Sequence, residues 1–550
     1  MDNINIGLRP LLESPYFHYA TWDIEASDWW TLQVIGLWDG ERYYHFQTIE
    51  AFLDFALQRK YRDWRFFAHF GGRYDTNFIF DVVRDRSDIH VSFYCAGAMV
   101  LGMTLERGDQ RIKLCDSYRL LPASLRDLGK AFQVEHPKTE YDFEAMAYSK
   151  ELLEYNEQDC RCLYEVLEQF FEQTGVRSET FATQSLRVFR KNYQKEVLWQ
   201  PHEHVSRFVR RSYVGGRTEI FKRGAPDLNV YDVNSMYPFV MIQSLPVRYI
   251  AESRTLRENW YGFVYAKVRI PEIYIPILPV RREKLYFPTG IIEGVWTVEE
   301  LLHSQYSGVE ILTIYQGYYF ETTTVFEEYI RTLYEQKKKA AEPLRTIAKF
   351  LLNSFYGKFG QNPLKKMYVK DNRAPFGSFP ILTPDGKETG FSYYERQSRA
   401  AYLLPHLSSA VTSKARLVLA ARLNHNAYYC DTDSIFTNQT MVEGKGLGDW
   451  SHVGSGDARF YQPKLYYFAG TWKSKGLNKN EDIAQYIEGG INHVMRHRSI
   501  KEALRYGVPA CASLTIEKRL HDGKPKRAWI GDDTRPWDIK ELDSYDKRTS

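Results

Sequence analysis

Three aspartates in the C-terminal two thirds of the chain have a spacing suited to metal-ion chemistry. Asp232 follows an apolar run, and Asp431 and Asp433 lie in the turn-like sequence Tyr-Cys-Asp-Thr-Asp-Ser between two further apolar runs. Because residues at i and i+2 of an extended chain point the same way, we expect Asp431 and Asp433 to project together. Like charges so close are costly unless a cation separates them. Two metal ions held there could activate a hydroxyl and neutralise a departing pyrophosphate.

A row of cations with the period of a helix lies between these acidic clusters. We predict one helix from about residue 324 to about 355, in which Arg345, Lys349 and Asn353 share a face at i, i+4 spacing. Lys337 lies close to the same stripe, a little over three turns before Lys349. Such a row suits the binding of a triphosphate. Taken alone, the acidic turn and the basic helix are each also compatible with ordinary surface structure.

A second acidic set lies nearer the N-terminus. Asp23 and Glu25 occupy alternate positions of a predicted strand and therefore share one side of it. Asp159, with Tyr155, falls on the apolar stripe of a helix predicted at about 149–173. A carboxylate on the buried face of a helix is costly without a partner. Metal ions would be that partner, and hydrogen bonds within the core are the alternative.

Strands and helices in an α/β arrangement must position these side chains. Residues 1–185 alternate amphipathic stretches with strand-like runs at 17–24, 31–37, 91–94 and 111–115. A second α/β region extends to about residue 435, and the remainder is basic and weakly patterned. Within that remainder, we predict that residues 473–479 form a loop that contacts phosphates.

Composition narrows the class of protein. At 550 residues, 44% of them apolar, the chain can build several domains with their own cores, which excludes a disordered protein. Residues 1–200 hold 23 Lys and Arg against 31 Asp and Glu, whereas residues 201–550 hold 50 against 38. The basic part suits a phosphate-backbone partner, with a solvated surface as the alternative. The few scattered cysteines fit a reducing compartment, and we expect a cytoplasmic protein without a membrane partner.

The three C-terminal segments, taken in order, resemble motifs A, B and C of family B DNA polymerases. Those motifs read Asp-x-x-Ser-Leu-Tyr-Pro, Lys-x3-Asn-Ser-x-Tyr-Gly and Tyr-x-Asp-Thr-Asp-Ser, and Met236 replaces the leucine of the first. The resemblance implies a metal site at Asp232, Val233 and Asp433, assisted by Asp431. It implies that the following residues bind the incoming nucleotide: Tyr237, Lys337, Arg345, Lys349, Asn353 and Tyr356. Tyr237 would lie under the deoxyribose and exclude a 2′-hydroxyl.

Segments at 19–25, 68–75 and 155–159 resemble the Exo I, Exo II and Exo III motifs of DEDD-type proofreading nucleases. The resemblance implies that two metal ions are held by Asp23, Glu25, Asp75 and Asp159. Tyr155 would orient the attacking water. The Exo II pattern usually has an asparagine, which helps to hold the single-stranded 3′ end, where this chain has Phe70. Phe70 can still stack on a base, so we expect the nuclease to survive.

Over nearly its whole length the chain resembles protein-primed family B polymerases of phages and linear plasmids. Tyr213-Val-Gly215-Gly216 matches their Tyr-x-Gly-Gly element between the two active sites, and Lys138 matches a residue that assists the nuclease. The resemblance implies the following DNA-binding residues: Phe70, Ser117, Tyr213, Gly215, Gly216, Thr412, Arg416, Lys464 and Tyr466.

The same resemblance implies a multidomain α+β and α/β protein, a right-hand polymerase with an N-terminal ribonuclease H-like exonuclease domain. The expected division is exonuclease 1–185, linker and first palm segment 186–240, palm with an insertion 241–323, fingers 324–360, second insertion 361–398, palm 399–470 and thumb 471–550. The first insertion would contact a priming protein. The second would close around DNA and provide processivity with strand displacement.

The function implied is DNA-templated DNA synthesis with 3′→5′ proofreading, begun from a terminal protein on a linear viral or plasmid genome. The cofactor would be Mg²⁺, or Mn²⁺, with two ions in each active site. The partners would be template–primer DNA, deoxynucleoside triphosphates and a terminal protein, bound by a monomer in the host cytoplasm. The alternatives are a nuclease with an inactive polymerase half and a non-catalytic DNA-binding replication protein. An RNA-templated enzyme is a more distant third.

Overall fold

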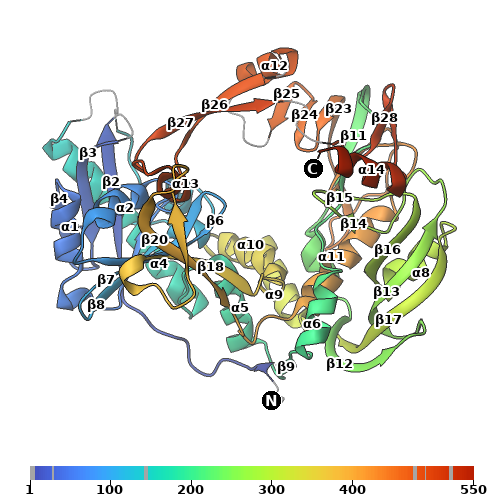
Figure 1. The fold of residues 1–550 in the computed structure, drawn as a ribbon, viewed down its shortest axis with the longest axis horizontal. Coiled ribbons are helices and arrows are strands. Elements are labelled where there is room, and N and C mark those ends of the chain that lie inside the picture. Colours follow the sequence, from blue (N-terminus) through green and yellow to red (C-terminus); the bar gives the residue numbers. More distant parts are fainter. Residues whose placement is uncertain are drawn as a thin grey trace.

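The computed structural model describes residues 6–27, 30–141, 147–474, 480–489, 491–519 and 524–549. Three sheets of ten, seven and four strands hold most of the strands, and helices pack around them (Figure 1). This mixture agrees with the predicted α+β and α/β class. Among the residues described, no helix combines the length and the apolar character needed to cross a lipid bilayer.

The ten-stranded sheet, ordered β19-β20-β18-β6-β7-β8-β5-β2-β3-β4, is built mainly from the N-terminal part of the chain. Its central strands β2, β5 and β8 run parallel, whereas β2–β3 and β7–β8 are antiparallel pairs. The strands predicted at 17–24, 31–37, 91–94 and 111–115 are β2, β3, β6 and β8. The N-terminal strands are β2 (Tyr19–Ser27), β3 (Thr31–Trp38), β4 (Tyr43–Phe46), β5 (Arg65–Ala68), β6 (His90–Ala96), β7 (Met99–Arg107) and β8 (Gln110–Asp116).

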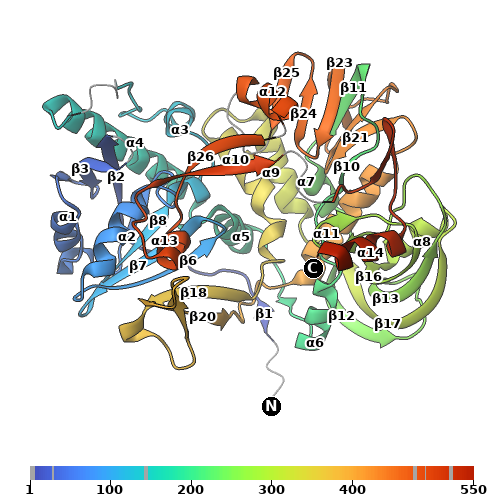
Figure 2. The ribbon, with the colours of Figure 1, turned by 45° about the horizontal axis from the view of Figure 1, so that its top comes forward.

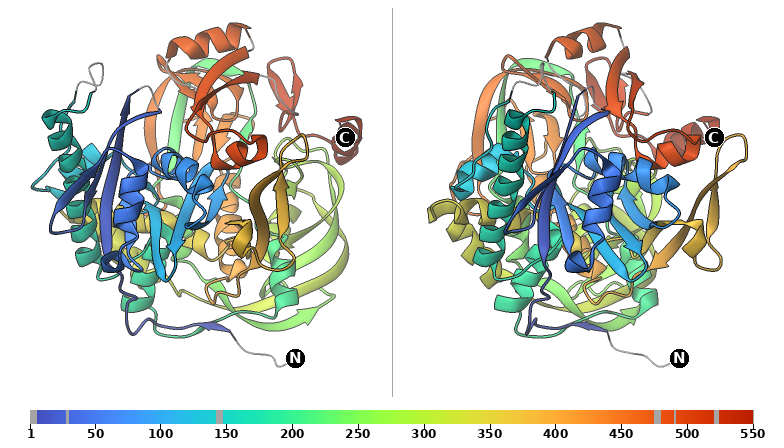
Figure 3. Two further views of the ribbon diagram at one scale, coloured as in Figure 1. Left: turned by 60° about the vertical axis from the view of Figure 1, so that its left-hand side comes forward. Right: turned by 90° about the vertical axis from the view of Figure 1, so that its left-hand side faces the viewer.

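Helices cover both faces of this sheet, with α4 on one side and α1 and α2 on the other (Figure 3). Phe66 and Phe67 are neighbours on β5 and point into the two opposite cores, as strand geometry requires. The predicted helix at 149–173 is α4, which the Ser149 side chain caps and which ends at Gly175 in the left-handed region. The helices are α1 (Ile49–Ala56), α2 (Asp75–Asp85), α3 (Leu125–Phe132), α4 (Lys150–Thr174), α5 (Phe181–Asn192) and α6 (Glu203–Arg210).

Residues 361–398, predicted as an insertion of their own, extend the edge of the ten-stranded sheet. β18 pairs antiparallel with β6, and the Tyr368 ring stacks on the Phe93 ring with centroids 5.1 Å apart. The two segments lie far apart in sequence, so no local pattern predicts the pairing. The strands are β18 (Leu364–Lys370), β19 (Phe379–Leu382) and β20 (Glu388–Gln397).

The seven-stranded sheet, ordered β10-β21-β22-β11-β23-β24-β25, carries the C-terminal acidic clusters. The two strands predicted around the acidic turn are β21 and β22, and Thr432 between them adopts a φ of 66°. The strands are β10 (Thr218–Ile220), β11 (Gly224–Val233), β21 (Ala427–Asp431), β22 (Ser434–Thr437), β23 (Trp450–Gln462), β24 (Leu465–Phe468) and β25 (Thr471–Ser474). The helices α7 (Met236–Met241) and α11 (Pro405–Ala420) accompany it.

The segment predicted as one helix from 324 to 355 forms two helices that pack against each other, α9 (Glu327–Lys339) and α10 (Leu344–Ser354). The single-helix prediction is wrong because Pro343, which has no N–H to donate, stands where the two helices meet. Before them lies the four-stranded sheet, ordered β12-β17-β13-β16. Its elements are β12 (Leu245–Ser253), β13 (Tyr261–Ile270), β16 (Gly290–Thr297), β17 (Glu310–Thr323) and α8 (Val298–Gln305). The short pairs are β1 (Gly7–Leu8) with β9 (Leu198–Trp199), and β14 (Val280–Arg281) with β15 (Leu285–Tyr286).

Residues 471–550, predicted as one thumb, pack against three parts of the protein: the seven-stranded, ten-stranded and four-stranded sheets. β25 belongs to the seven-stranded sheet, and β26 and β27 run between that sheet and the ten-stranded sheet (Figures 1 and 2). Ile500 and Leu504 of α13 enter the core under α2, whereas Ile539 and Leu542 of α14 enter the core of the four-stranded sheet. Of the predicted phosphate-contacting loop, 475–479 lie outside the described residues. The elements are α12 (Asn480–Gly489), β26 (Ile491–His497), α13 (Ile500–Tyr506), β27 (Ser513–Arg519), β28 (Ala528–Ile530), β29 (Asp533–Arg535) and α14 (Ile539–Thr549).

Two candidate active sites

Carboxylates from β2, α2 and α4 converge in the N-terminal part of the chain. One oxygen from each of Asp23, Glu25 and Asp159 lies within 4.8 Å of the others. Asp23 and Glu25 reach this point from one side of β2, in line with their i, i+2 spacing. Asp159 is 4% exposed, on α4, and Asp75, the first residue of α2, is 3% exposed. The structure therefore brings the four predicted side chains to one buried place.

Burial raises the pKa of all four carboxyl groups in this cluster, and repulsion adds to this at Asp23, Glu25 and Asp75. Burial and then the charge of Asp159 raise the pKa of Asp23 to about 7, and burial and then Asp23 raise the pKa of Glu25 to about 10. Burial, followed by Asp23, raises the pKa of Asp75 well above its usual value. Burial also raises the pKa of Asp159, although Lys138 opposes it. Divalent cations would relieve this repulsion.

Lys138 and Tyr155 complete the cluster. The Lys138 ammonium forms an ion pair with Asp159 and donates a hydrogen bond to the Tyr155 hydroxyl at 2.7 Å. Tyr155 precedes Asp159 by one turn of α4, so both side chains lie on the same face of that helix. Asp159 Oδ1 is buried and has no hydrogen-bond partner among the described residues. An acceptor left in this way is suited to a cation.

The DNA-contacting residues predicted beside this cluster are not equally accessible. Phe70 is 39% exposed, adopts a φ of 63°, and stacks on Tyr118 with ring centroids 3.9 Å apart. Such backbone strain in a residue other than glycine concentrates at functional sites. Ser117 is fully buried, donates to the Ala68 carbonyl at 3.1 Å and lies 3.0 Å from His69 Nδ1. Its hydroxyl faces the core in this structure, and a direct contact of Ser117 with DNA stays a prediction.

Asp116 belongs to this cluster, although no role was predicted for it. It ends β8 beside Ala68 of the parallel strand β5, is 4% exposed, and its charge helps to raise the pKa of Asp75. Its Oδ2 also has no partner within the described part of the chain. The predicted strand at 111–115 stops just before Asp116. Since ligands bind at the carboxyl ends of parallel strands, that position was a usable signal.

Asp232 and Asp433 meet on the seven-stranded sheet. Asp232 of β11 pairs with Ser434, the residue after Asp433, and the Val233 N–H donates to the Asp433 carbonyl at 2.8 Å. Burial and then the charge of Asp433 raise the pKa of Asp232 to about 6. Burial likewise raises the pKa of Asp433. Two carboxyl groups that are partly desolvated and repel each other form the second candidate site for cations.

Asp431 is held differently from Asp433. Lys464 lies 2.6 Å from one carboxylate oxygen of Asp431, and the Thr218 hydroxyl donates to the other at 3.1 Å. Because Thr432 adopts a left-handed conformation, the extended-chain argument for Asp431 and Asp433 does not apply. The expectation that residues 431–433 are extended is wrong, and the turn places the carboxyl groups of Asp431 and Asp433 in different environments. Lys464, predicted as a DNA contact, therefore has a partner inside the protein.

Cations face this site from both helices of the α9–α10 pair. Lys337 of α9 donates to the Ser235 hydroxyl at 3.0 Å, and burial followed by the charge of Lys349 lowers the pKa of Lys337. Arg345, Lys349 and Asn353 are exposed along α10, while the residues between them are mostly buried. The cations predicted on one helix therefore lie on two helices, with Lys337 of α9 near Lys349 of α10.

Aromatic rings and close glycines surround the same site. Tyr237 stacks on Tyr356 with centroids 4.3 Å apart and planes inclined by 28°. Burial and then the charge of Tyr237 raise the pKa of Tyr213. A Cβ on Gly216 would lie 2.8 Å from the Thr432 side chain, so the acidic turn requires a glycine there. The Tyr213–Gly216 segment thus packs directly against the turn that carries Asp433.

Two other predicted DNA contacts are buried in α11. Arg416 is 3% exposed, pairs with Glu300 at 2.7 Å, and donates to the Gly215 carbonyl at 3.1 Å. Thr412 is 2% exposed and bonds within its own helix. Both side chains have partners inside the protein, and direct DNA contacts by Arg416 and Thr412 stay predictions. Tyr466 is half-buried and packs among the aromatic rings of β21–β24.

The donor sets of both clusters fit Mg²⁺ or Mn²⁺, which prefer oxygen ligands. Asp23, Glu25 and Asp159 offer oxygens within 4.8 Å of one another, and Asp159 Oδ1 is an unused acceptor among the residues described. Asp232 and Asp433 offer a second facing pair, each with a raised pKa. The group formed by Asp23, Glu25 and Asp159 offers carboxylate oxygens, the ligand type that these hard cations prefer.

A family model described as DNA polymerase type B, organellar and viral, matches residues 56–150 and 146–376. The chain is 24% identical over 535 residues to the "Probable DNA polymerase" of Ascobolus immersus, covering 80% of this chain and 43% of that protein. It is 27% identical over 429 residues to the "DNA-directed DNA polymerase" of Enterobacteria phage PRD1, covering 71% and 70%. Its structure is similar to phi29 DNA polymerase complexed with primer-template DNA and incoming nucleotide substrates, with a TM-score of 0.72, 18% identity, and coverage of 92% and 99%.

The structural likeness shows the fold, a right-hand polymerase with an N-terminal exonuclease domain. The chain spans about two fifths of the length of the first curated relatives it matches, at 43%, 40% and 39% for the proteins of Ascobolus immersus, Podospora anserina and Neurospora intermedia. The family match covers more than half of this chain and includes Asp75, Asp159, Asp232 and Lys349. The chain therefore belongs to the family DNA polymerase type B, organellar and viral.

Proposed function

We propose that this chain is a DNA-templated DNA polymerase that corrects its own errors with a 3′→5′ exonuclease. The observation that carries the proposal is the presence of two carboxylate clusters, one where α4 packs on the ten-stranded sheet, at Asp159 and Asp23, and one on the seven-stranded sheet, at Asp232 and Asp433. Phosphoryl transfer with two metal ions needs one such cluster for each reaction. One cluster would add nucleotides to a primer and the other would remove them.

In synthesis, Asp232 and Asp433 would hold two magnesium ions, and Mn²⁺ could replace them. Bound there, the ions would supply Lewis-acid stabilisation of the phosphoryl group being transferred. Lys337 and Lys349 would bind the triphosphate from the two helices of the α9–α10 pair, with Arg345 beside them. Tyr237, stacked on Tyr356, would support the deoxyribose and the nascent base pair.

In proofreading, Asp23, Glu25, Asp75 and Asp159 would hold the second pair of ions. The Tyr155 hydroxyl would orient the attacking water, and the hydrogen bond from Lys138 at 2.7 Å would fix the position of that hydroxyl. Phe70, exposed and stacked on Tyr118, would hold a base of the single-stranded 3′ end. Asp23, Asp75 and Asp159 lie on β2, α2 and α4, outside the seven-stranded sheet, so we expect mutations to separate the two reactions.

A basic cavity of about 720 Å³ between the ten-stranded sheet and α5 supports a single-stranded template partner. Burial and then the charge of Lys365 lower the pKa of Lys358 in this cavity to about 7. A phosphate would restore the charge of Lys358. Cations line the cavity at Arg65, Lys113, Arg119, Arg187, Lys358, Lys365 and Lys366.

The resemblance to protein-primed enzymes leads us to propose that synthesis begins on a hydroxyl of a separate terminal protein. The genome copied would be linear, viral or plasmid-borne, and the enzyme would act as a monomer in the host cytoplasm. Incubation with a candidate terminal protein, one labelled deoxynucleotide and magnesium should give a labelled protein adduct. An adduct that still forms with Asp433→Ala would contradict this route.

Extension of a labelled primer on a DNA template, with magnesium and all four deoxynucleoside triphosphates, tests the main proposal. We expect extension with the nucleotides and shortening without them. Shortening alone would favour a nuclease with an inactive polymerase half. Binding without either reaction would favour a non-catalytic replication protein. Replacing the template with RNA should abolish extension, and equal extension on RNA would indicate an RNA-templated enzyme.

A further inference from the structure

A buried cluster of charged side chains lies behind the acidic turn, on the strand next to it. Arg217, Glu219 and Arg527 are 1%, 0% and 2% exposed. Arg217 donates to one oxygen of Glu219 from Nε at 2.8 Å and from Nη2 at 2.6 Å. Arg527 Nη1 lies 3.9 Å from the same oxygen. Two guanidinium groups from opposite ends of the polymerase region therefore share one buried carboxylate.

This cluster is connected directly to the acidic turn. Strand β10 pairs with β21, so that Thr218 lies opposite Asp431 and Glu219 lies opposite Cys430. The Thr218 hydroxyl donates to Asp431 Oδ1 at 3.1 Å. The Arg217 carbonyl accepts the N–H of Thr432 at 2.7 Å. A displacement of β10 would therefore move the turn that carries Asp433.

The C-terminal segment 524–549 forms hydrogen bonds at the end of β10. Arg527 donates to the Tyr274 carbonyl at 2.9 Å and to the Thr534 hydroxyl at 2.8 Å. That hydroxyl lies 2.8 Å from the carbonyl of Phe221, the residue directly after β10. Arg527 is thus held in place from both sides.

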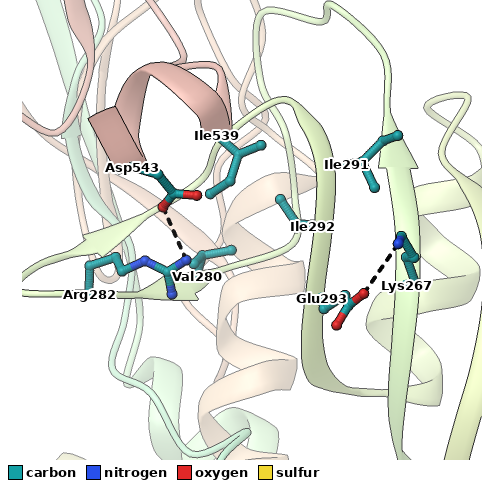
Figure 4. A pocket seen from close by; sticks show the side chains of 8 residues that line it. All are labelled: Lys267, Val280, Arg282, Ile291, Ile292, Glu293, Ile539 and Asp543. Atoms are coloured by element: carbon teal, nitrogen blue, oxygen red, sulfur yellow. Dashed lines mark hydrogen bonds and ion pairs between the residues drawn. The ribbon is translucent and has the colours of Figure 1, made fainter. Parts of the chain in front are cut away.

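Helix α14 anchors the other end of the segment on the four-stranded sheet. Figure 4 shows Ile539 and Asp543 of α14 beside Arg282 and Ile292, around a cavity of about 230 Å³. Asp543 forms an ion pair with Arg282 at 3.3 Å, and Ile539 is 7% exposed. The segment is therefore attached to two sheets and is not a free tail.

We propose that the C-terminal segment positions the acidic turn of the synthesis site, with Arg527 as its positioning residue acting through Glu219 and β10. The proposal rests on the proposed polymerase function. Its physical basis is the burial of the cluster: without Arg527, Glu219 keeps Arg217 but loses the second positive charge beside it, so we expect the buried side chains and β10 to rearrange. β10 belongs to the seven-stranded sheet, whereas β2, α2 and α4 carry the nuclease cluster, so we expect the effect to be specific to synthesis.

The test compares Arg527→Met with two controls in the full chain. Arg527→Lys keeps the positive charge, and Arg535→Met removes an arginine of the same segment whose side chain is 43% exposed and forms an ion pair with Glu541 on the surface. For Arg527→Met we expect kcat of primer extension to fall by about 10- to 100-fold, the range for partners behind metal ligands. Arg527→Lys should recover most of the rate, and Arg535→Met should behave as wild type.

A general loss of structure is distinguished by two further measurements. Degradation of single-stranded DNA should stay within about twofold of wild type in Arg527→Met, as should KM for the primer–template. Mn²⁺ binding, followed by electron paramagnetic resonance in an Asp23→Ala/Asp159→Ala background, should weaken by about tenfold. Mn²⁺ binding does not depend on turnover, so it tests the positioning role of Arg527 even if the chain extends no primer. A failure of the wild-type chain to extend primers would overturn only the proposed function. Equal extension and Mn²⁺ binding by wild type and Arg527→Met, or equal loss of both activities, would overturn the positioning role.

Discussion

The Lys464 ammonium lies 2.6 Å and 2.8 Å from the two carboxylate oxygens of Asp431. Asp431 is thus charge-compensated within the protein, whereas burial and repulsion raise the pKa of both Asp232 and Asp433. We infer that Asp232 and Asp433 are the metal ligands and that the Asp431–Lys464 pair holds the acidic turn in place. The sequence assigned Lys464 to DNA, and the structure gives it this internal partner.

Lys464→Met should lower kcat of primer extension by about 10- to 100-fold, the range for a partner behind a metal ligand. The variant leaves Asp431 without its cation, so its charge would repel Asp433 or recruit a metal ion wrongly. Lys464→Arg, which keeps the charge, is the matched control. Steady-state extension at saturating nucleotide measures the effect, and a wild-type rate for Lys464→Met would show that the ion pair is dispensable.

The metal-free protein should lose stability as the pH rises. The folded-state pKa of Asp23 is about 7 and that of Glu25 about 10, both above their ordinary values of 3.8 and 4.5. Groups with raised pKa values stabilise the fold fully below the ordinary pKa, and this contribution disappears as the pH passes the folded-state value. In EDTA, Tm should therefore fall from about pH 4 to about pH 10, the range between the ordinary and the folded-state pKa values. Magnesium or manganese should remove much of that slope.

The control for this pH dependence is Asp23→Asn/Glu25→Gln, in which neither side chain titrates. Its Tm in EDTA should vary less with pH than that of the wild type. A wild-type Tm that rises over the same range in EDTA would contradict the assignment of these carboxyl groups to one repulsive cluster.

Phe70→Ala should weaken the binding of single-stranded DNA at the nuclease site. Loss of the ring exposed beside Tyr118 should raise KM for single-stranded DNA by about tenfold, since stacking of one base on an aromatic ring contributes about 1–3 kcal/mol. The carboxylates are untouched, so kcat should change little. Phe70→Tyr keeps the flat ring and should retain the wild-type KM. An unchanged KM for Phe70→Ala would rule out stacking by this residue.

Asp81→Ala should shorten the products made in a single binding event. Asp81 of α2 accepts the N–H groups of Ala510 at 2.7 Å and Cys511 at 2.8 Å, which join α13 and β27 to the ten-stranded sheet. Hydrogen bonds to charged groups contribute about 1.5–3 kcal/mol each. Asp85→Ala, which removes a 74% exposed carboxylate from the same helix, is the control. Product lengths measured with a DNA trap that match wild type would contradict a docking role for Asp81.

Local patterns predicted which carboxylates share a face, because alternation on β2 and helical spacing on α4 orient Asp23, Glu25 and Asp159 without reference to distant residues. Patterns of this kind could not predict burial in the assembled protein. Arg416 looks like a DNA contact in sequence and is buried against Glu300. The pairing of β18 with β6 likewise depends on segments distant in sequence, which no local period reports.

Separation of the two reactions tests the central claim most directly. Asp433→Ala and Asp159→Ala are compared with wild type in the same buffer, by extension of a primed template and by degradation of a single strand. We expect Asp433→Ala to lose extension and keep degradation, and Asp159→Ala to do the reverse. If Asp433→Ala extends primers normally, or if either substitution abolishes both reactions in a folded protein, two independent carboxylate centres do not exist in this chain.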